Sequence, residues 1–519
     1  MVGSRALKLA RGAAVAAIAA LGAGSAAVAP ASVAAVAQTP VAAVHVVPFA
    51  TGHIVAAGHM KQPPTTAECQ EYFGIACYQA FQRQRAYDLA PLFSRNIEGQ
   101  GETIVIVDAF GSPSIASDLQ TFDSQMGLPN PPSFRVITPE GPITTNPTTC
   151  TSVYSPTGPD LCSDYYGWTD ETSLDVEWSH VMAPEANILL VETPMTETEG
   201  IYGFPQIVAA ENYVVDHHLG DVISQSFGAT EQTFTSPSQI YSLRSAYVNA
   251  ARHGVTVLAA TGDQGSTDYL CDPSTGCADP DNVSCCYTTR AVDWPSSDPL
   301  VTGVGGTQLH LNSEGYRTAP DSVWNDLSST VGIPGPVYTA YGSGGGGHSL
   351  VFSRPEFQDG VAGIVGDSRG TPDIAMSAAV NGAVDFYDTT DPGVAGWGIV
   401  GGTSEASPLF AGIVALADQV AGHSLGYLNP ALYAMAQDRR HDGIVPIFQG
   451  NNTYTTCTDI QSDGSCASSS DLVTVPGFNA DGYYNDASGW GTVDAASFVP
   501  ALARAAGSGG SGYLNRHRP

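Results

Sequence analysis

The sequence predicts an α/β fold with a doubly wound, mostly parallel sheet and helices on both faces, in a single large domain. Short apolar runs alternate with helical patterns between Cys69 and Ala505, which is typical of a parallel sheet with helical crossovers. No linker interrupts this stretch. The chain has 519 residues, 43% of them hydrophobic and 13% charged, so it can bury a large core.

The predicted strands include Thr103–Asp108, a continuous β-branched apolar run, as expected of a strand that is buried on both faces of a parallel sheet. The other predicted strands are Ile188–Glu192, Asp221–Gly228 and Val255–Ala260. The predicted helices end at residues that stop helices, such as Pro184 and Gly254, or begin after a glycine-rich turn. They are Thr169–Met182, Ser238–His253 and Glu405–Val420.

The amino-terminal residues predict export. A short basic region precedes the uncharged, Ala/Val-rich run Gly12–Ala34, and a small-residue cleavage site ends at Ala37. This pattern is typical of a secretory signal peptide, with a membrane anchor as the alternative. We therefore expect a signal peptide at 1–37, a short pro-segment or linker at 38–66, a folded domain at 67–505 and a flexible tail at 506–519. The expected location is extracellular.

The charge balance excludes two classes of partner. The chain has 50 acidic and 19 basic residues, for a net charge of −31. Such a surface repels nucleic acids and anionic membranes. It also suits an acidic medium, because few positive charges remain to repel one another once the carboxylates are protonated.

The ten cysteines fit an oxidising compartment and predict disulfides. Zinc is the alternative for the central cluster, but that cluster lacks a Cys-x-x-Cys pair. Three pairs are close in sequence, and a fourth group leaves its pairing open: Cys69/Cys77, Cys150/Cys162, Cys457/Cys466, and Cys271 with Cys277, Cys285 and Cys286.

The segment Gly401–Pro408 (GGTSEASP) predicts a nucleophile at Ser404. Glycines before a serine at a helix start allow a sharp turn, and the free N–H groups of the helix favour a developing oxyanion. The segment resembles the nucleophile motif of subtilisin-like serine peptidases. The alternative is a serine that merely caps the helix.

The base that a serine nucleophile needs is not the usual histidine. None of the 12 histidines is followed by Gly-Thr, as in the subtilisin motif. The predicted helix Thr169–Met182 offers Glu171 and Asp175, which lie four residues apart on one face. If they share a site, one pKa rises and a proton is shared. The alternative is a solvated acidic face.

A third acid, Asp263, follows a predicted strand in the segment Ala259–Gly265 (AATGDQG). Subtilisins have an asparagine in this context that donates to the oxyanion. A carboxylic acid can donate only when it is protonated, which suits activity at acid pH. The alternative is an aspartate of an ordinary turn.

Together these residues resemble the sedolisin family, the serine-carboxyl peptidases, over Cys69 to Ala505. The resemblance implies a subtilisin-like fold in which Ser404 is the nucleophile, Glu171 the base, Asp175 its partner and Asp263 the oxyanion acid. It makes Asp108 at most a secondary member of this network. The segments that carry it are Glu171–Pro184, Gly254–Asp268, Trp294–Thr307, Gly344–Gln358, Arg369–Ile374, Gly401–Gly412 and Tyr427–Tyr433.

The expected function is that of a secreted, acid-active serine-carboxyl peptidase, a monomer that acts on polypeptides. Endopeptidase and tripeptidyl-peptidase activity both occur on this scaffold and stay open. One alternative is a non-catalytic extracellular binding protein with the same fold. Another is a neutral subtilisin-type peptidase, which the missing histidine motif and Asp263 disfavour.

The sequence departs from the family in two respects. The long pro-domain that the family usually has is replaced by the short segment 38–66. The calcium site has Pro446 and Asn485 where the family has acidic ligands, and calcium affinity depends on ligand charge. We therefore expect no cofactor, although Asp442 or Asp486 could serve a shifted site.

Overall fold

The computed structural model describes residues 55–56, 60–143, 161–197, 200–268, 287–326, 342–438, 442–457 and 472–513. These residues belong to one compact unit that begins at Ala42. The predicted signal peptide lies outside the described residues, so it stays a prediction. So do the pairings of cysteines other than Cys69 and Cys77, whose predicted disulfide is confirmed. Within the described part of the chain, no helix is long and apolar enough to cross a membrane.

An eight-stranded sheet forms the centre of this unit, in the order β11-β10-β8-β6-β3-β5-β4, with β14 also paired to β10. All its pairs are parallel except β10 with β11. The predicted α/β class and parallel sheet are therefore confirmed. The strands are β3 (Thr103–Ala109), β4 (Phe134–Ile137), β5 (Asn187–Thr193), β6 (Val222–Gln225), β8 (Thr256–Ala260), β10 (Thr302–Gln308), β11 (Ser322–Val323) and β14 (Ile374–Ser377).

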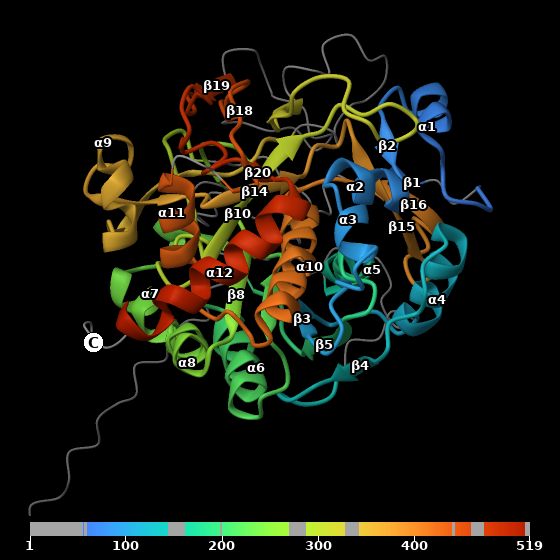
Figure 1. Ribbon diagram of the computed structural model, residues 1–519, viewed down its shortest axis with the longest axis horizontal. Coiled ribbons are helices and arrows are strands. Elements are labelled where there is room, and N and C mark those ends of the chain that lie inside the picture. Colours follow the sequence, from blue (N-terminus) through green and yellow to red (C-terminus); the bar gives the residue numbers. More distant parts are fainter. Residues whose placement is uncertain are drawn as a thin grey trace, which may run out of the picture. The chain divides into compact units, whose positions relative to one another are not determined.

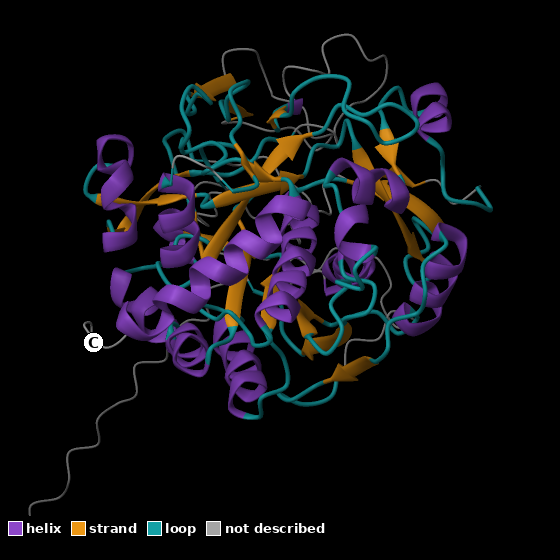
Figure 2. Ribbon diagram, viewed as in Figure 1, coloured by secondary structure: helices purple, strands orange, loops and turns teal. Residues whose placement is uncertain are grey.

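Helices cover both faces of this sheet (Figures 1 and 2). Ile104 and Ile106 of β3 belong to one apolar core, whereas Val105 and Val107 belong to another, because successive side chains of a strand point to opposite faces. The first core includes α5 and α10, and α12 crosses α10 on this side (Figure 1). The second core includes α6 and α8. The helices are α5 (Leu161–Met182), α6 (Phe204–Asp216), α8 (Ser245–His253), α10 (Thr403–Ala421) and α12 (Ala495–Tyr513).

Several helix boundaries differ from the predicted ones, and α10 begins two residues before the predicted Glu405. The predicted helix Ser238–His253 is two helices, α7 (Pro237–Leu243) and α8, because Arg244 leaves helical geometry with ψ of 3°. Its guanidinium binds Asp298 through two N–H groups, at 2.5 and 2.8 Å. Helix α5 begins eight residues before the predicted start at Thr169. Helix α12 continues past residue 505, where the sequence predicted the domain to end.

A second sheet, in the order β1-β16-β15-β2, was not predicted. Its strand β16 ends directly before Gly401 and so positions the turn that carries the predicted nucleophile. Strand β1 lies in the predicted pro-segment and pairs antiparallel with β16. The disulfide Cys69–Cys77 joins α1 to β2. The elements are β1 (Val55–Ala56), α1 (Thr66–Tyr72), β2 (Cys77–Tyr78), β15 (Ala383–Asp388) and β16 (Gly396–Val400).

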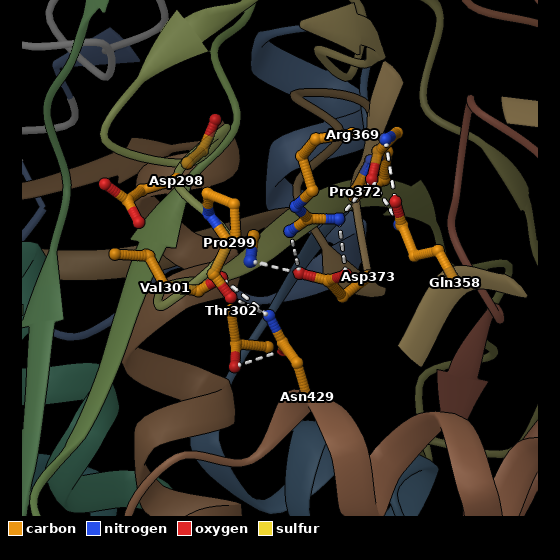
Figure 3. Close-up of polar contacts among 12 residues, drawn as sticks. Asp298, Pro299, Val301, Thr302, Gln358, Arg369, Pro372, Asp373 and Asn429 are labelled. Carbon is orange, nitrogen blue, oxygen red and sulfur yellow. Dashed lines mark hydrogen bonds and ion pairs between the residues drawn. The ribbon is translucent and has the colours of Figure 1, made fainter. Parts of the chain in front are cut away.

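Buried polar contacts connect strand β10 to neighbouring segments (Figure 3). Arg369 binds both carboxylate oxygens of Asp373 at 2.7 and 2.5 Å. Asp373 also accepts hydrogen bonds from the N–H of Gly303 in β10 and from the hydroxyl of Tyr433, each at 2.8 Å. The hydroxyl of Thr302 donates to Asn429 Oδ1 at 2.7 Å. The segments Arg369–Ile374 and Tyr427–Tyr433 thus hold β10 in place.

The remaining elements are short and lie around the two sheets. They are α2 (Ala80–Ala86), α3 (Ala90–Phe93), α4 (Ile115–Met126), α9 (Ala362–Val365), α11 (Asn429–Gln437), β7 (Ala229–Thr230), β9 (Asp293–Trp294), β12 (Gly347–Ser353), β13 (Ser368–Thr371), β17 (Ile444–Val445), β18 (Tyr454–Cys457), β19 (Leu472–Val475) and β20 (Thr492–Val493).

Candidate active site

Ser404 is the second residue of α10 and is fully buried. Gly402 before it has φ of 125° and ψ of 160°, a conformation that side-chain-bearing residues rarely adopt. A Cβ atom at Gly401 would lie 2.6 Å from the backbone oxygen of Ala378. Among the described residues the Ser404 hydroxyl has no hydrogen-bond partner. The glycines therefore place an uncommitted hydroxyl at the start of a long helix.

Asp263 is held against the residue that precedes Ser404. It follows β8, and its Oδ1 accepts hydrogen bonds from both the N–H and the hydroxyl of Thr403, each at 2.7 Å. In a protonated carboxyl group one oxygen accepts and the other carries the proton. Because Thr403 makes Oδ1 the acceptor, a proton on Asp263 belongs on Oδ2.

Asp175 is connected to the same turn through Ser226, which follows β6. The Ser226 hydroxyl donates to Asp175 Oδ1 at 2.9 Å, and the backbone oxygen of Ser404 lies 3.3 Å from the same hydroxyl. Two residues earlier, Ser224 forms a hydrogen bond of 2.8 Å with Ser407, one turn further along α10. The carboxyl end of β6 thus joins α5 to α10.

Sequence reasoning missed Ser226, because it treated Asp221–Gly228 only as a strand of the sheet. The available signal was the pair of hydroxyls two residues apart at the carboxyl end of that strand. In a parallel α/β sheet this end is where sites form.

Glu171 and Asp175 are both fully buried, so the alternative of a solvated acidic face is wrong. Burial raises the pKa of Asp175 well above its ordinary value, and the negative charges of Asp108 and Glu171 raise it further. The hydrogen bond from Ser226 opposes this shift. Two carboxyl groups that are close and buried hold a proton between them more readily than either alone.

Asp108 belongs to the same electrostatic cluster, because its charge acts on the pKa of Asp175. It is fully buried near the end of β3, and burial raises its pKa to about 7. The Thr172 hydroxyl lowers this pKa, and Glu192 raises it. Glu192 is the register partner of Asp108 on β5, and burial raises its own pKa to about 7. The acidic cluster therefore extends from α5 into the sheet.

The two histidines that the sequence analysis considered have other partners. His180 is buried at the far end of α5, where its Nε2 lies 2.7 Å from the backbone oxygen of Pro129 and 3.4 Å from Asp123. Burial lowers the pKa of His180 to about 4. His348 contacts Asp486 at 3.0 Å.

The residues at the family's calcium position do not fit a calcium site. Asn485 Oδ1 accepts hydrogen bonds from the N–H of Ala487 and from the N–H and hydroxyl of Ser488, at 3.1, 2.9 and 3.0 Å. Its oxygen therefore serves the turn. Asp486 is engaged by His348. Elsewhere in the described ranges, metal-type ligands gather only at Cys69, Cys77 and Asp385, where the two cysteines are bonded to each other.

Comparison with known proteins identifies the relatives of this chain. Residues 169–432 match the family model described as the subtilase family. Kumamolisin of Bacillus sp. (strain MN-32) is 32% identical over 379 residues, which cover 72% of this chain and 58% of kumamolisin. Sedolisin of Pseudomonas sp. (strain 101) is 29% identical over 307 residues, covering 58% and 44%. Human tripeptidyl-peptidase 1 is 26% identical over 347 residues, covering 64% and 51%.

A solved structure of Pseudomonas sedolisin, a serine-carboxyl proteinase complexed with two molecules of pseudo-iodotyrostatin, shares the fold. It has a TM-score of 0.59 at 24% identity and covers 82% of this chain and 97% of its own. The chain belongs to the subtilase family. Its similarity to kumamolisin and sedolisin places it in the sedolisin family within that larger group. The chain spans about half the length of the relatives it matches.

Proposed function

We propose that this protein is a secreted, acid-active serine-carboxyl peptidase. Ser404 is the nucleophile, Glu171 the general base, Asp175 the partner of that base and Asp263 the oxyanion acid. The observation that carries the proposal is the convergence of three elements on one turn. Asp263 binds Thr403, Ser226 connects Asp175 to Ser404, and the Ser404 hydroxyl is left uncommitted.

In the proposed reaction the Ser404 oxygen attacks the carbonyl carbon of a peptide bond, and its proton passes to Glu171. The oxyanion that forms is stabilised by the protonated Oδ2 of Asp263. The carbon–nitrogen bond then breaks, and Glu171 gives its proton to the departing amine. Water repeats the sequence on the acyl-enzyme, which releases the acid product and restores Ser404.

Activity at acid pH agrees with the proposed donor role of Asp263, because only a protonated carboxyl group can donate a hydrogen bond. Burial and neighbouring acids also raise the pKa of Asp175 and of Asp108, so the cluster around the base keeps protons in acid solution. Loss of these protons at higher pH places several negative charges next to the developing oxyanion.

Export is supported by the amino-terminal pattern and by the disulfide Cys69–Cys77, because disulfides persist in oxidising compartments. The relatives include a tripeptidyl-peptidase, so both endopeptidase and tripeptide-releasing activity remain within the proposal. We further propose that the enzyme is a monomer and uses no metal ion.

The test is incubation of the purified protein with a denatured protein between pH 3 and pH 7, followed by mass-spectrometric mapping of the products. Internal cleavage identifies an endopeptidase, and stepwise release of tripeptides identifies a tripeptidyl-peptidase. Ser404→Ala is the matched control and should give no products. Binding of the polypeptide without cleavage at any pH would favour the non-catalytic alternative.

A further inference from the structure

A buried arginine from the amino-terminal part of the chain reaches the first turn of α10. Arg83 lies on α2, more than three hundred residues from the nucleophile in sequence, and its side chain is fully buried. Its Nη2 lies 3.0 Å from Glu405 Oε1, and both side chains are 0% exposed. Glu405 is the residue that directly follows Ser404.

The same guanidinium also binds the segment against which the nucleophile turn packs. Its Nη1 donates to the hydroxyl of Ser377 at 2.5 Å, and its Nη2 donates to the backbone oxygen of Gly382. Between these two residues, the backbone oxygen of Ala378 accepts a hydrogen bond of 2.6 Å from the N–H of Gly402. Arg83 therefore holds together both sides of the contact that precedes Ser404.

Opposite charges near Arg83 compensate for the burial of its guanidinium group. A buried cation is costly unless opposite charge and hydrogen bonds surround it. Glu405 provides one acid, and the fully buried Asp385 on β15 is a second that interacts with the Arg83 charge. Arginine stays protonated in proteins, so it can bind Glu405 whether or not that carboxyl group is ionised. Tyr78 packs with its ring 5.2 Å from the guanidinium carbon.

We propose that Arg83 is a positioning residue for Ser404. Through Glu405, Ser377 and Gly382 it fixes the first turn of α10 relative to the end of β14, and so fixes the direction of the Ser404 hydroxyl. This inference rests on the proposed peptidase function, because it concerns the reactivity of the nucleophile. It predicts that losing the Arg83–Glu405 contact slows acylation even when the fold is intact.

The experiment uses the double variant Arg83→Met/Glu405→Met, which removes both charges and leaves neither buried alone. We expect its melting temperature to stay within a few degrees of the parent, since a buried ion pair can be replaced by apolar residues of similar size without loss of stability. We expect kcat to fall at least tenfold while KM changes less than twofold. The rate of labelling by a serine-reactive phosphonate should fall in parallel.

The control is Arg244→Met/Asp298→Met, which removes an arginine–aspartate pair with contacts of 2.5 and 2.8 Å. The described partners of Arg244 do not include α2 or α10, so the kcat and labelling rate of this variant should equal those of the parent. Arg83→Lys provides a second test, because it keeps the charge but loses the planar fork of donors. It should label at least threefold more slowly than the parent.

Parental kcat and labelling in a folded Arg83→Met/Glu405→Met variant would show that the pair is only structural. If that double variant does not fold, parental labelling by Arg83→Lys overturns the inference in the same way. If the parent neither cleaves peptides nor reacts with the phosphonate, the proposed function is wrong, and the inference that rests on it fails as well.

Discussion

Asp263 accepts two hydrogen bonds at a single oxygen from Thr403, the residue that directly precedes Ser404. The aspartate is thereby fixed relative to the nucleophile, and its other oxygen is the place for a proton. A substitution that keeps the acceptor oxygen but replaces the proton-bearing oxygen therefore tests the catalytic role of Asp263 separately from its structural role.

Asp263→Asn should fold normally, because the amide oxygen can still accept from Thr403. The amide group donates at every pH, so the residual activity should fall more slowly at the alkaline side than that of the parent. Asp263→Ala should lose both contacts and nearly all activity. The measurement is kcat/KM against pH for the three proteins. An alkaline limb that is identical in parent and Asp263→Asn would show that Asp263 does not control it.

Strand β3 could be predicted because its apolar run is long and uninterrupted. Predicted Thr103–Asp108 and observed Thr103–Ala109 differ by one residue. The predicted helix Ser238–His253 is helical except at Arg244, where it is divided in two. The sequence did not show this break, because it depends on the tertiary contact of Arg244 with Asp298. The second sheet was missed because β1 and β2 are two residues long and their partners lie more than three hundred residues away.

The four site residues were predicted from motifs, and the structure brings them to neighbouring elements. What the motifs could not predict are the side chains that hold them. Ser226 and Arg83 lie in segments with no site motif, and their roles depend on contacts across the fold. Serine and arginine residues are common in sequences, so only their burial and their contacts in the fold distinguish Ser226 and Arg83.

Ser226→Ala should lower kcat/KM roughly five- to tenfold, because it removes one hydrogen bond to Asp175, worth about 1 kcal/mol. The expected change is in kcat, and the melting temperature should fall by only a few degrees. Ser173→Ala is the matched control. Ser173 is buried like Ser226 but lies on α5, and its hydroxyl donates to the backbone oxygen of Thr169 at 3.0 Å. Equal losses in the two variants would contradict a specific role for Ser226.

Stability should fall as the pH rises above the acid range. Burial raises the pKa of Glu211 from 4.5 to about 8, and neither of its carboxylate oxygens has a partner among the described residues. The folded protein thus keeps a proton that the unfolded chain loses, so this contribution is complete below about pH 4.5 and is lost between there and about pH 8. Burial acts in the same direction on Asp123, whose pKa is also raised to about 8.

The measurement is the free energy of unfolding from urea titrations at pH 4, 6 and 8. Each unit of raised pKa corresponds to about 1.4 kcal/mol, so the parent should lose several kcal/mol over this range. Glu211→Gln should be about as stable as the parent at pH 4, where both side chains are neutral, and should show a shallower decline. Exposed Glu140→Gln is the control. A stability that increases from pH 4 to pH 8 would contradict these assignments.

Removal of divalent metal should not destabilise the protein, because Asn485 uses its oxygen to hold a turn and Pro446 has no oxygen in its side chain. We expect EDTA at neutral pH to change the melting temperature by about one degree or less. A decrease of ten degrees or so, reversed by added calcium, would reveal a calcium site formed by other residues.

The serine–carboxyl mechanism is tested most directly by the pH profile of kcat/KM for the parent, Ser404→Ala, Glu171→Ala and Asp175→Ala. The account predicts a parent maximum between about pH 3 and pH 5.5, since ordinary carboxyl pKa values lie near 4 and burial raises them. Ser404→Ala should be inactive and folded, Glu171→Ala nearly as impaired, and Asp175→Ala less so. A parent maximum at pH 8, or full activity in Glu171→Ala, would contradict the account and favour a histidine-dependent subtilisin-type mechanism.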